Sequence, residues 1–340
     1  MYIKQLKDLD YRTDDLRQVF FYRMYTKASG SHNVILDMYE KGEITDQDIE
    51  MFRFLYDVRF ATKQQIIRRC PWLDWNTFDE RSKKWIRDRF MNAFMLTDER
   101  NNTIQEDAFK IYTIDYAAIT LLSHFSSDRD IYNWNPRCLL HNHVLIKQDL
   151  LATEFRIACE RKLVRRPLSY DSYRMYTFGR FRLIPNAQVF FNVSSTESEV
   201  KEKPYLVVTF TIDDFLYGDK TRVDEMIGRY EQWYEEETWK NNFKEIPGIL
   251  FVCDNGLTAD YLKKIMKDRA GAEEDRIHYK NSSAIPMYQQ MMITCGVKFK
   301  IDLENCFEKY DFLNDQWISL NLPYLEEKNR REVEMYYDEE

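Results

Sequence analysis

The sequence predicts a mixed α/β protein with two domains. The chain has 340 residues, which exceeds the size at which one hydrophobic core usually keeps growing. Residues 41–125 show helical periodicity and then two strand-like runs around a polar tip. Beyond them, helical and strand-like segments alternate with short connections, which is typical of a sheet with parallel strands. We expect an N-terminal arm over 1–40, a first domain over 41–125, a linker over 126–147, an α/β domain over 148–325 and an acidic tail over 326–340.

The arm is expected to be helical in part. Leu16, Val19 and Phe20 open an aromatic-rich stretch that a Ser/Gly segment at 28–31 interrupts. It could pack on its own chain or on a second subunit, and we favour its own chain.

The first domain is predicted from three successive helix starts. Each places a threonine three residues before a side chain that can reach back to the helix start, as in a capping box. The pairs are Thr45 with Asp48, Thr62 with Gln65, and Thr77 with Glu80. Two strand-like runs at 95–97 and 109–114 follow, and residues 115–124 predict another helix. This order indicates a winged helix-turn-helix domain.

The third of these helices is the candidate DNA-reading element. Lys83 and Arg87 lie one turn apart on a face that its apolar residues leave free, so both could reach phosphate or a base edge in a major groove. The alternative is an ordinary solvated face on which acids pair with the cations. We favour contact with double-stranded DNA by Lys63, Arg68, Arg69, Arg81, Lys83, Lys84, Arg87, Arg89 and Arg100.

The second domain is predicted from two adjacent strands at 184–191 and 205–212, preceded by a helix over 144–162. Helical spacing over 223–234 predicts a helix that docks aromatic side chains on the sheet. A continuous apolar run at 248–254 indicates a strand buried on both faces, and a helix over 258–267 follows. Alternation at 297–301 adds a candidate edge strand.

Composition narrows the class of protein. A net charge of −8 argues against indiscriminate coating of nucleic acid. Charge is nevertheless segregated: residues 59–91 hold nine Lys or Arg against four Asp or Glu, whereas the tail from Tyr324 holds three against seven. No apolar run approaches the roughly 18 residues that a membrane helix requires, and residues 1–8 contain no signal core. We expect a cytoplasmic protein with no membrane partner.

The metal-ligating residue types are dispersed. Six cysteines show no short CxxC spacing, which indicates reduced, inert thiols. His141 and His143 have no Cys or Glu partner at metal-site spacing. We therefore expect no metal and no cofactor.

The order of several short motifs resembles the replication-relaxation family of plasmids, phages and integrative elements. The resemblance covers roughly residues 44 to 270. It depends on the motifs at 112–117, 143–150, 184–186 and 208–211, then on the helix at 230–234 and the strand at 249–253. It implies a winged helix followed by a restriction-endonuclease-like domain of the PD-(D/E)xK type.

This chain departs from the family pattern where nuclease chemistry would occur. The resemblance implies an Asp on the first strand and an acidic pair on the second, and the matching positions here are Asn186, Thr209 and Thr211. A metal-dependent nuclease needs carboxylates that converge on Mg²⁺, and amides and hydroxyls are weak ligands for it. Asp213 and Asp214 lie just beyond and are the candidates for a relocated acid pair.

Three functions follow as hypotheses. The first is a non-enzymatic DNA-binding protein of a mobile element that acts in replication, transfer or transcriptional control, with the second domain as a docking or dimer platform. The second is a metal-dependent nuclease or nicking accessory that uses relocated acids. The third is a protein–protein adaptor that binds no DNA. A homodimer and contacts with replication or transfer proteins stay open as partners.

Overall fold

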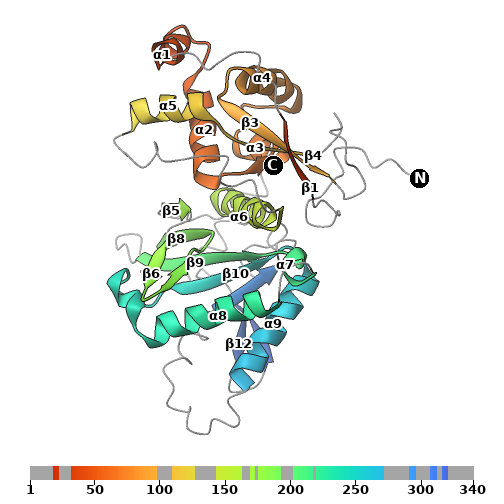
Figure 1. Cartoon of the computed structure of the whole chain (residues 1–340), viewed down its shortest axis with the longest axis vertical. Coiled ribbons are helices and arrows are strands. Elements are labelled where there is room, and N and C mark those ends of the chain that lie inside the picture. The colour runs from red at the N-terminus through yellow and green to blue at the C-terminus, as the bar shows by residue number, and fades with distance from the viewer. Residues whose placement is uncertain are drawn as a thin grey trace, which may run out of the picture. The chain divides into compact units, whose positions relative to one another are not determined.

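The structure is a computed structural model that describes residues 18–22, 32–97, 109–126, 143–162, 169–172, 175–192, 202–216, 220–271, 291–295, 307–311 and 316–320 (Figure 1). The chain divides into two compact units, Met1–Thr153 and Glu154–Glu340. Both contain helices and sheets, so the predicted mixed α/β class is confirmed.

Unit 1 is built on an antiparallel sheet with the strand order β1-β3-β4-β2. The two strands predicted around a polar tip are confirmed as β3 and β4, and the tip at 98–108 lies outside the described residues. The helical prediction for residues 16–25 is wrong where the structure describes them, because residues 18–22 form β1 and pair with β3 of the same chain. The elements are β1 (Gln18–Tyr22), α1 (His32–Glu40), α2 (Asp46–Val58), β2 (Ala61–Thr62), α3 (Lys63–Arg69), α4 (Trp75–Arg87), β3 (Met91–Thr97), β4 (Phe109–Ile114) and α5 (Tyr116–Phe125).

Side-chain caps define the starts of α2, α3 and α4. Capping boxes at Thr45 and Thr62 are confirmed, each with reciprocal side-chain and backbone hydrogen bonds. The predicted start at Thr77 is wrong: Asp74 is the N-cap of α4, and its carboxylate accepts from the backbone N of Thr77 at 2.7 Å. Leu73 before this cap and Phe78 four residues after it are both buried, which is the pattern of a hydrophobic staple.

Aromatic packing holds α2 and α4 on the sheet of unit 1. Phe52 of α2 stacks on Phe90 with ring centroids 5.4 Å apart and meets Trp85 of α4 edge-on at 5.9 Å. Phe78 of α4 packs edge-on against Tyr112 of β4 at 5.0 Å. Since these rings are all buried, they fix which side of α4 faces the core.

Helix α6 (His143–Lys162) spans the division between the units, and its residues up to Thr153 belong to unit 1. Ile146 and Leu150 pack in a core cluster with residues of β3 and β4. The Gln65 side-chain amide donates to the carbonyl of Leu150 at 2.8 Å. The expected linker over 126–147 therefore ends in helix from residue 143, and residues 127–142 lie outside the described residues.

Unit 2 is built on a mixed sheet with the order β13-β12-β11-β10-β9-β8-β5 among the described strands. β9, β10 and β11 are parallel, as the alternation of strands and helices predicts, while β5, β8, β12 and β13 pair antiparallel. The candidate edge strand at 297–301 lies outside the described residues. The elements are β5 (Ser169–Ser172), β6 (Tyr176–Phe178), β7 (Phe181–Leu183), β8 (Ala187–Asn192), β9 (Glu202–Phe210), α7 (Ile212–Leu216), α8 (Lys220–Glu235), a 3₁₀ turn (Thr238–Asn241), β10 (Gly248–Cys253), α9 (Gly256–Gly271), β11 (Met291–Cys295), β12 (Phe307–Asp311) and β13 (Gln316–Leu320).

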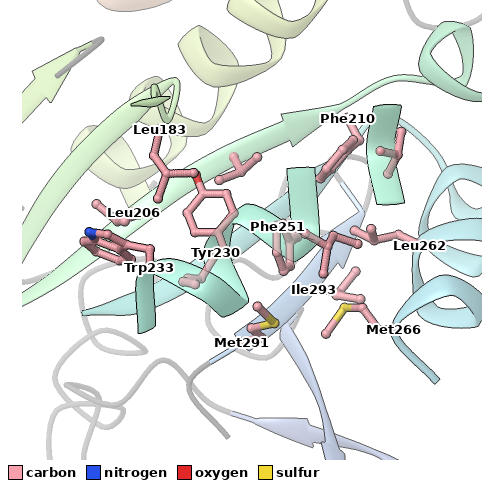
Figure 2. Packing of buried hydrophobic residues seen from close by; sticks show 14 of the residues in the cluster. Leu183, Leu206, Phe210, Tyr230, Trp233, Phe251, Leu262, Met266, Met291 and Ile293 are labelled. Atoms are coloured by element: carbon pink, nitrogen blue, oxygen red, sulfur yellow. The ribbon is translucent and has the colours of Figure 1, made fainter. Parts of the chain in front are cut away.

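The helices α8 and α9 lie on the same side of this sheet (Figure 1), as two right-handed crossovers in one direction require. Their side chains meet alternate residues of the parallel strands in one core cluster. Every residue of β10 is buried, which confirms a strand covered on both faces. Figure 2 shows this cluster, with Tyr230, Trp233, Leu262 and Met266 of the helices gathered against Leu206, Phe210, Phe251, Met291 and Ile293 of the strands.

Gly248 in β10 is predicted to be intolerant of a side chain. A Cβ at this position would lie 2.3 Å from the buried ring of its strand partner Tyr205. Gly248→Ala is therefore expected to destabilise the protein by about 1–3 kcal/mol through overpacking, measured by urea unfolding. Gly256→Ala is the control, because a Cβ there meets nothing within 4 Å, and it should be neutral or stabilise by up to about 1 kcal/mol. Equal effects of the two substitutions would contradict this account.

Candidate functional site

The outer side of α4 is the candidate nucleic-acid interface. Its exposed residues recur every three or four positions and form one stripe along the helix, which we call the α4 stripe. The stripe contains two acids in its first half and two cations in its second half, so it has no net charge. Its polar members are Asn76, Asp79, Glu80, Lys83 and Arg87, and Trp75 is also exposed at the start of the helix.

Arg81 has a structural role. Its guanidinium donates a short charge-assisted hydrogen bond to Asp48 of α2, whose side chain is 1% exposed. The same Asp48 carboxylate accepts from the backbone N and the hydroxyl of Thr45, at 2.8 and 2.9 Å. Arg81 therefore neutralises a buried capping carboxylate and joins α4 to α2.

Most of the other predicted DNA-binding cations also have carboxylate partners. Lys63 contacts Asp79 at 2.6 Å and lies 3.7 Å from the centroid of the Trp75 ring system. The remaining pairs are Arg69 with Glu50 at 3.2 Å, Lys84 with Glu43 at 2.9 Å, Arg87 with Asp88 at 2.9 Å and Arg89 with Asp115 at 3.3 Å.

These pairs change the local charge of the predicted interface. Four of the acids, Glu43, Asp48, Glu50 and Asp115, lie outside the basic segment 59–91 in sequence. When these four acids are counted with the segment, its net charge falls from +5 to +1, because nine cations are then set against eight acids. Lys83 is exposed and forms no ion pair within the described part of the chain. Arg68 retains contacts inside the fold, and Arg100 lies outside the described residues.

The second candidate site lies at one edge of the sheet in unit 2. β9 and β10 are parallel and end at this edge, and β8 begins there because it is antiparallel to β9. Ligand sites in open α/β sheets lie at such carboxyl ends. The residues brought together, which we call the carboxyl-edge cluster, are Asn186, Thr209, Thr211, Asp213, Asp214 and Asp254.

Asn186 and Thr209, two of the positions where the resemblance implies acids, lie in direct contact. The side-chain oxygen of Asn186 accepts from the backbone N of Thr209 at 2.9 Å. The backbone pairing of β8 with β9 ends at Ala187 and Val207. The side chain of Asn186, the residue before β8, adds one more hydrogen bond between the two segments beyond that pair. Asn186 thus provides a hydrogen-bond acceptor for the backbone N–H of Thr209, which the sequence alone does not reveal.

Two carboxylates of the cluster satisfy backbone groups at the start of α7. Asp214 accepts from the backbone N of Thr211 at 2.7 Å and from its hydroxyl at 3.2 Å. Asp254, which directly follows β10, accepts from the backbone N of Ile212 at 2.9 Å and from the Thr258 hydroxyl at 2.5 Å. Asp254 is not among the site residues predicted from the sequence, although a carboxylate directly after a buried parallel strand is a recognisable signal.

Burial dominates the electrostatics of Asp254. It raises the pKa of this carboxyl above its ordinary value, while the bonds from Thr258 and Ile212 partly oppose the shift and the nearby charge of Asp213 adds to it. No three His, Cys, Asp or Glu side chains group around a common metal position anywhere in the described ranges. His141 lies outside those ranges, and His143 begins α6.

Arg81→Ala is predicted to be the most destabilising alanine substitution on α4's polar side. The substitution leaves the buried Asp48 carboxylate without its cation. Removing one partner of a buried ion pair lowers the free energy of unfolding by about 3–5 kcal/mol. This is an upper bound here, because the Arg81 side chain is one-third exposed. Lys84→Ala is the control, since its pair with Glu43 is exposed and worth about 0–1 kcal/mol. Urea unfolding of both variants tests the difference, and an equal loss would refute the structural role of Arg81.

Asp254→Asn is predicted to gain stability relative to the parent chain as pH rises. A carboxyl whose pKa is raised by folding stays protonated longer in the folded state, so the parent loses stability between the unfolded pKa of about 3.9 and the higher folded pKa. Asparagine does not ionise and can still accept from Ile212. Urea unfolding at several pH values from 4 to 7 should show the difference growing, whereas a constant difference would contradict the assignment.

No helix in the described ranges is long and apolar enough to cross a membrane. Comparisons of this chain with models of protein families, with curated proteins and with solved structures gave no match.

Proposed function

We propose that the chain is a non-enzymatic protein that binds double-stranded DNA through α4. The observation that supports this most is the order of elements in unit 1, α2–β2–α3–α4–β3–β4, with β2 and β3 pairing on either side of β4. That order is the one expected of a winged helix-turn-helix domain, in which α4 takes the place of the recognition helix.

The α4 stripe supplies the contacts in this proposal. Lys83 is exposed, and the exposed pair of Arg87 with Asp88 is weak enough for a phosphate to replace the carboxylate. Asn76 lies in the first turn of α4, where an amide can bond to the edge of an adenine. Glu80 repels phosphate and Asp79 is paired with Lys63, so the cationic half of the stripe is favoured on the duplex and non-specific coating is opposed.

The role proposed for unit 2 is docking or dimerisation. The carboxylates of Asp214 and Asp254 are used by backbone and hydroxyl donors, and Asn186 and Thr209 bring no negative charge to the cluster. This arrangement supports a binding role more than the alternative of a nuclease with relocated acids at Asp213 and Asp214. The resemblance to the replication-relaxation family extends the proposal to replication, transfer or transcriptional control of a mobile element.

A protein–protein adaptor is the second candidate, and one observation favours it. Residues 1–153 hold 22 Lys or Arg against 23 Asp or Glu, and most cations of the predicted interface are paired within the fold. A segment with so little net charge suits a protein partner as well as it suits DNA. Failure of the chain to retain DNA at low salt would favour this candidate.

Lys83→Ala combined with Arg87→Ala is expected to weaken binding to a short labelled DNA duplex by about tenfold or more, measured by fluorescence anisotropy at low salt. Both side chains are exposed, so the fold should be unchanged. Lys41→Ala combined with Arg53→Ala is the matched control, because it removes two exposed cations of the same unit from α2 and the turn after α1. Equal losses for the two double variants would show that only net charge matters and would exclude α4 as the contact.

A further inference from the structure

The β6–β7 hairpin of unit 2 is a small antiparallel sheet of its own. Tyr176 pairs with Leu183 and Phe178 with Phe181, so the connecting turn is Gly179–Arg180. Gly179 has a φ of +52°, which suits the first position of a tight two-residue hairpin turn. A Cβ built on Gly179 would meet nothing within 4 Å, so the turn lies in open space.

The inner side of the hairpin is firmly anchored. Tyr176, Phe178 and Leu183 are buried in the core cluster of unit 2. The Tyr176 ring contacts Trp233 and Phe243 with centroids 5.8 and 5.5 Å apart, and its hydroxyl donates a short hydrogen bond to Gln188. The hairpin is therefore held in one orientation, and its outer side is presented as a fixed surface.

The outer side is basic and partly apolar. Arg180 and Arg182 are exposed, and neither guanidinium forms an ion pair with any carboxylate in the described ranges; Arg180 lies 5.2 Å from the Phe181 ring centroid. Two large apolar side chains flank them, Met175 at 51% exposure and Ile184 at 57%. This contrasts with α4, where Arg81, Lys84 and Arg87 all have acidic partners.

The charge of this region is local. As a sequence, residues 161–182 hold seven Lys or Arg against one acid, an excess of +6 that is larger than the one at 59–91. Residues 154–340 as a whole hold 27 Lys or Arg against 34 acids. A polyanion would therefore be attracted to the hairpin and repelled by most of the rest of the unit.

We propose that the β6–β7 hairpin is a second contact with duplex DNA, made by Arg180 and Arg182. A two-stranded β-ribbon fits the major groove, and arginine binds phosphate or guanine edges in a bidentate manner. Met175 and Ile184 provide apolar surface that can contact thymine methyl groups in the groove. The inference extends the proposed DNA binding to unit 2 and rests on that function for its choice of ligand.

The test compares three double variants of the full chain in fluorescence anisotropy with a short labelled duplex at low salt. Arg180→Ala with Arg182→Ala is expected to weaken binding by about tenfold. Lys264→Ala with Lys267→Ala removes the same charge from exposed positions of α9 in the same unit and should change binding by less than about twofold. Lys83→Ala with Arg87→Ala reports on α4 separately.

The outcomes distinguish the two proposals. A loss in the hairpin variant alone supports the hairpin contact and refutes the α4 contact. A loss in the α4 variant alone refutes the hairpin contact and leaves the proposed function intact. Equal losses in the hairpin and α9 variants refute the hairpin assignment, because net charge would then explain both. An unchanged affinity for DNA together with hairpin-dependent binding of poly-glutamate would also refute it, in favour of an acidic protein partner.

Discussion

The packing of helices in both units depends on a buried carboxylate that must be hydrogen-bonded near the start of a helix. Asp48 in unit 1 and Asp254 in unit 2 are each about 1% exposed. A buried charge is costly unless hydrogen bonds and opposite charges satisfy it, so each carboxylate fixes the elements around it. Asp48 caps α2 and binds Arg81 of α4, while Asp254 binds the first turn of α7 and Thr258 of α9.

Polar residues that satisfy these carboxylates are not available to bind a ligand. On α4, Arg81 is bound to Asp48, whereas Lys83 and Arg87 are exposed on the surface. At the carboxyl edge of the unit 2 sheet, Asp214 and Asp254 accept hydrogen bonds from backbone N–H groups. A metal-dependent catalytic site would instead need several carboxylates that bind one metal ion. The proposed DNA contacts are therefore made by a few exposed cations, two on α4 and two on the β6–β7 hairpin.

Local signals in the sequence predicted much of the fold; one wrong prediction came from a competing local signal and another from a long-range contact. The caps at Thr45 and Thr62 were predictable because each is followed by its partner three residues later. Thr77 with Glu80 shows the same spacing, yet Asp74 is the cap; the staple of Leu73 and Phe78, also local, distinguishes the two. β1 is a strand because it pairs with β3, which is far away in sequence. The spacing of apolar residues within 16–25 cannot predict such a pairing.

The charge around the predicted interface also depends on contacts between residues that are distant in sequence. A window over residues 59–91 counts only acids that are near in sequence, whereas Glu43, Glu50 and Asp115 reach the same cations through the fold. The converse holds for the hairpin, where Arg180 and Arg182 show no acidic partner in the described ranges although unit 2 is acidic overall. Which cations are available to a polyanion is therefore a property of the folded chain.

The salt dependence of DNA binding tests this account most directly, because it counts the phosphates that the protein neutralises. Each such contact contributes about −0.9 to the slope of log K against log salt concentration. Four available arginines and lysines predict a slope of roughly −3 to −4. A slope near −8, as use of all nine cations of residues 59–91 would give, would contradict the account, and so would the absence of measurable binding.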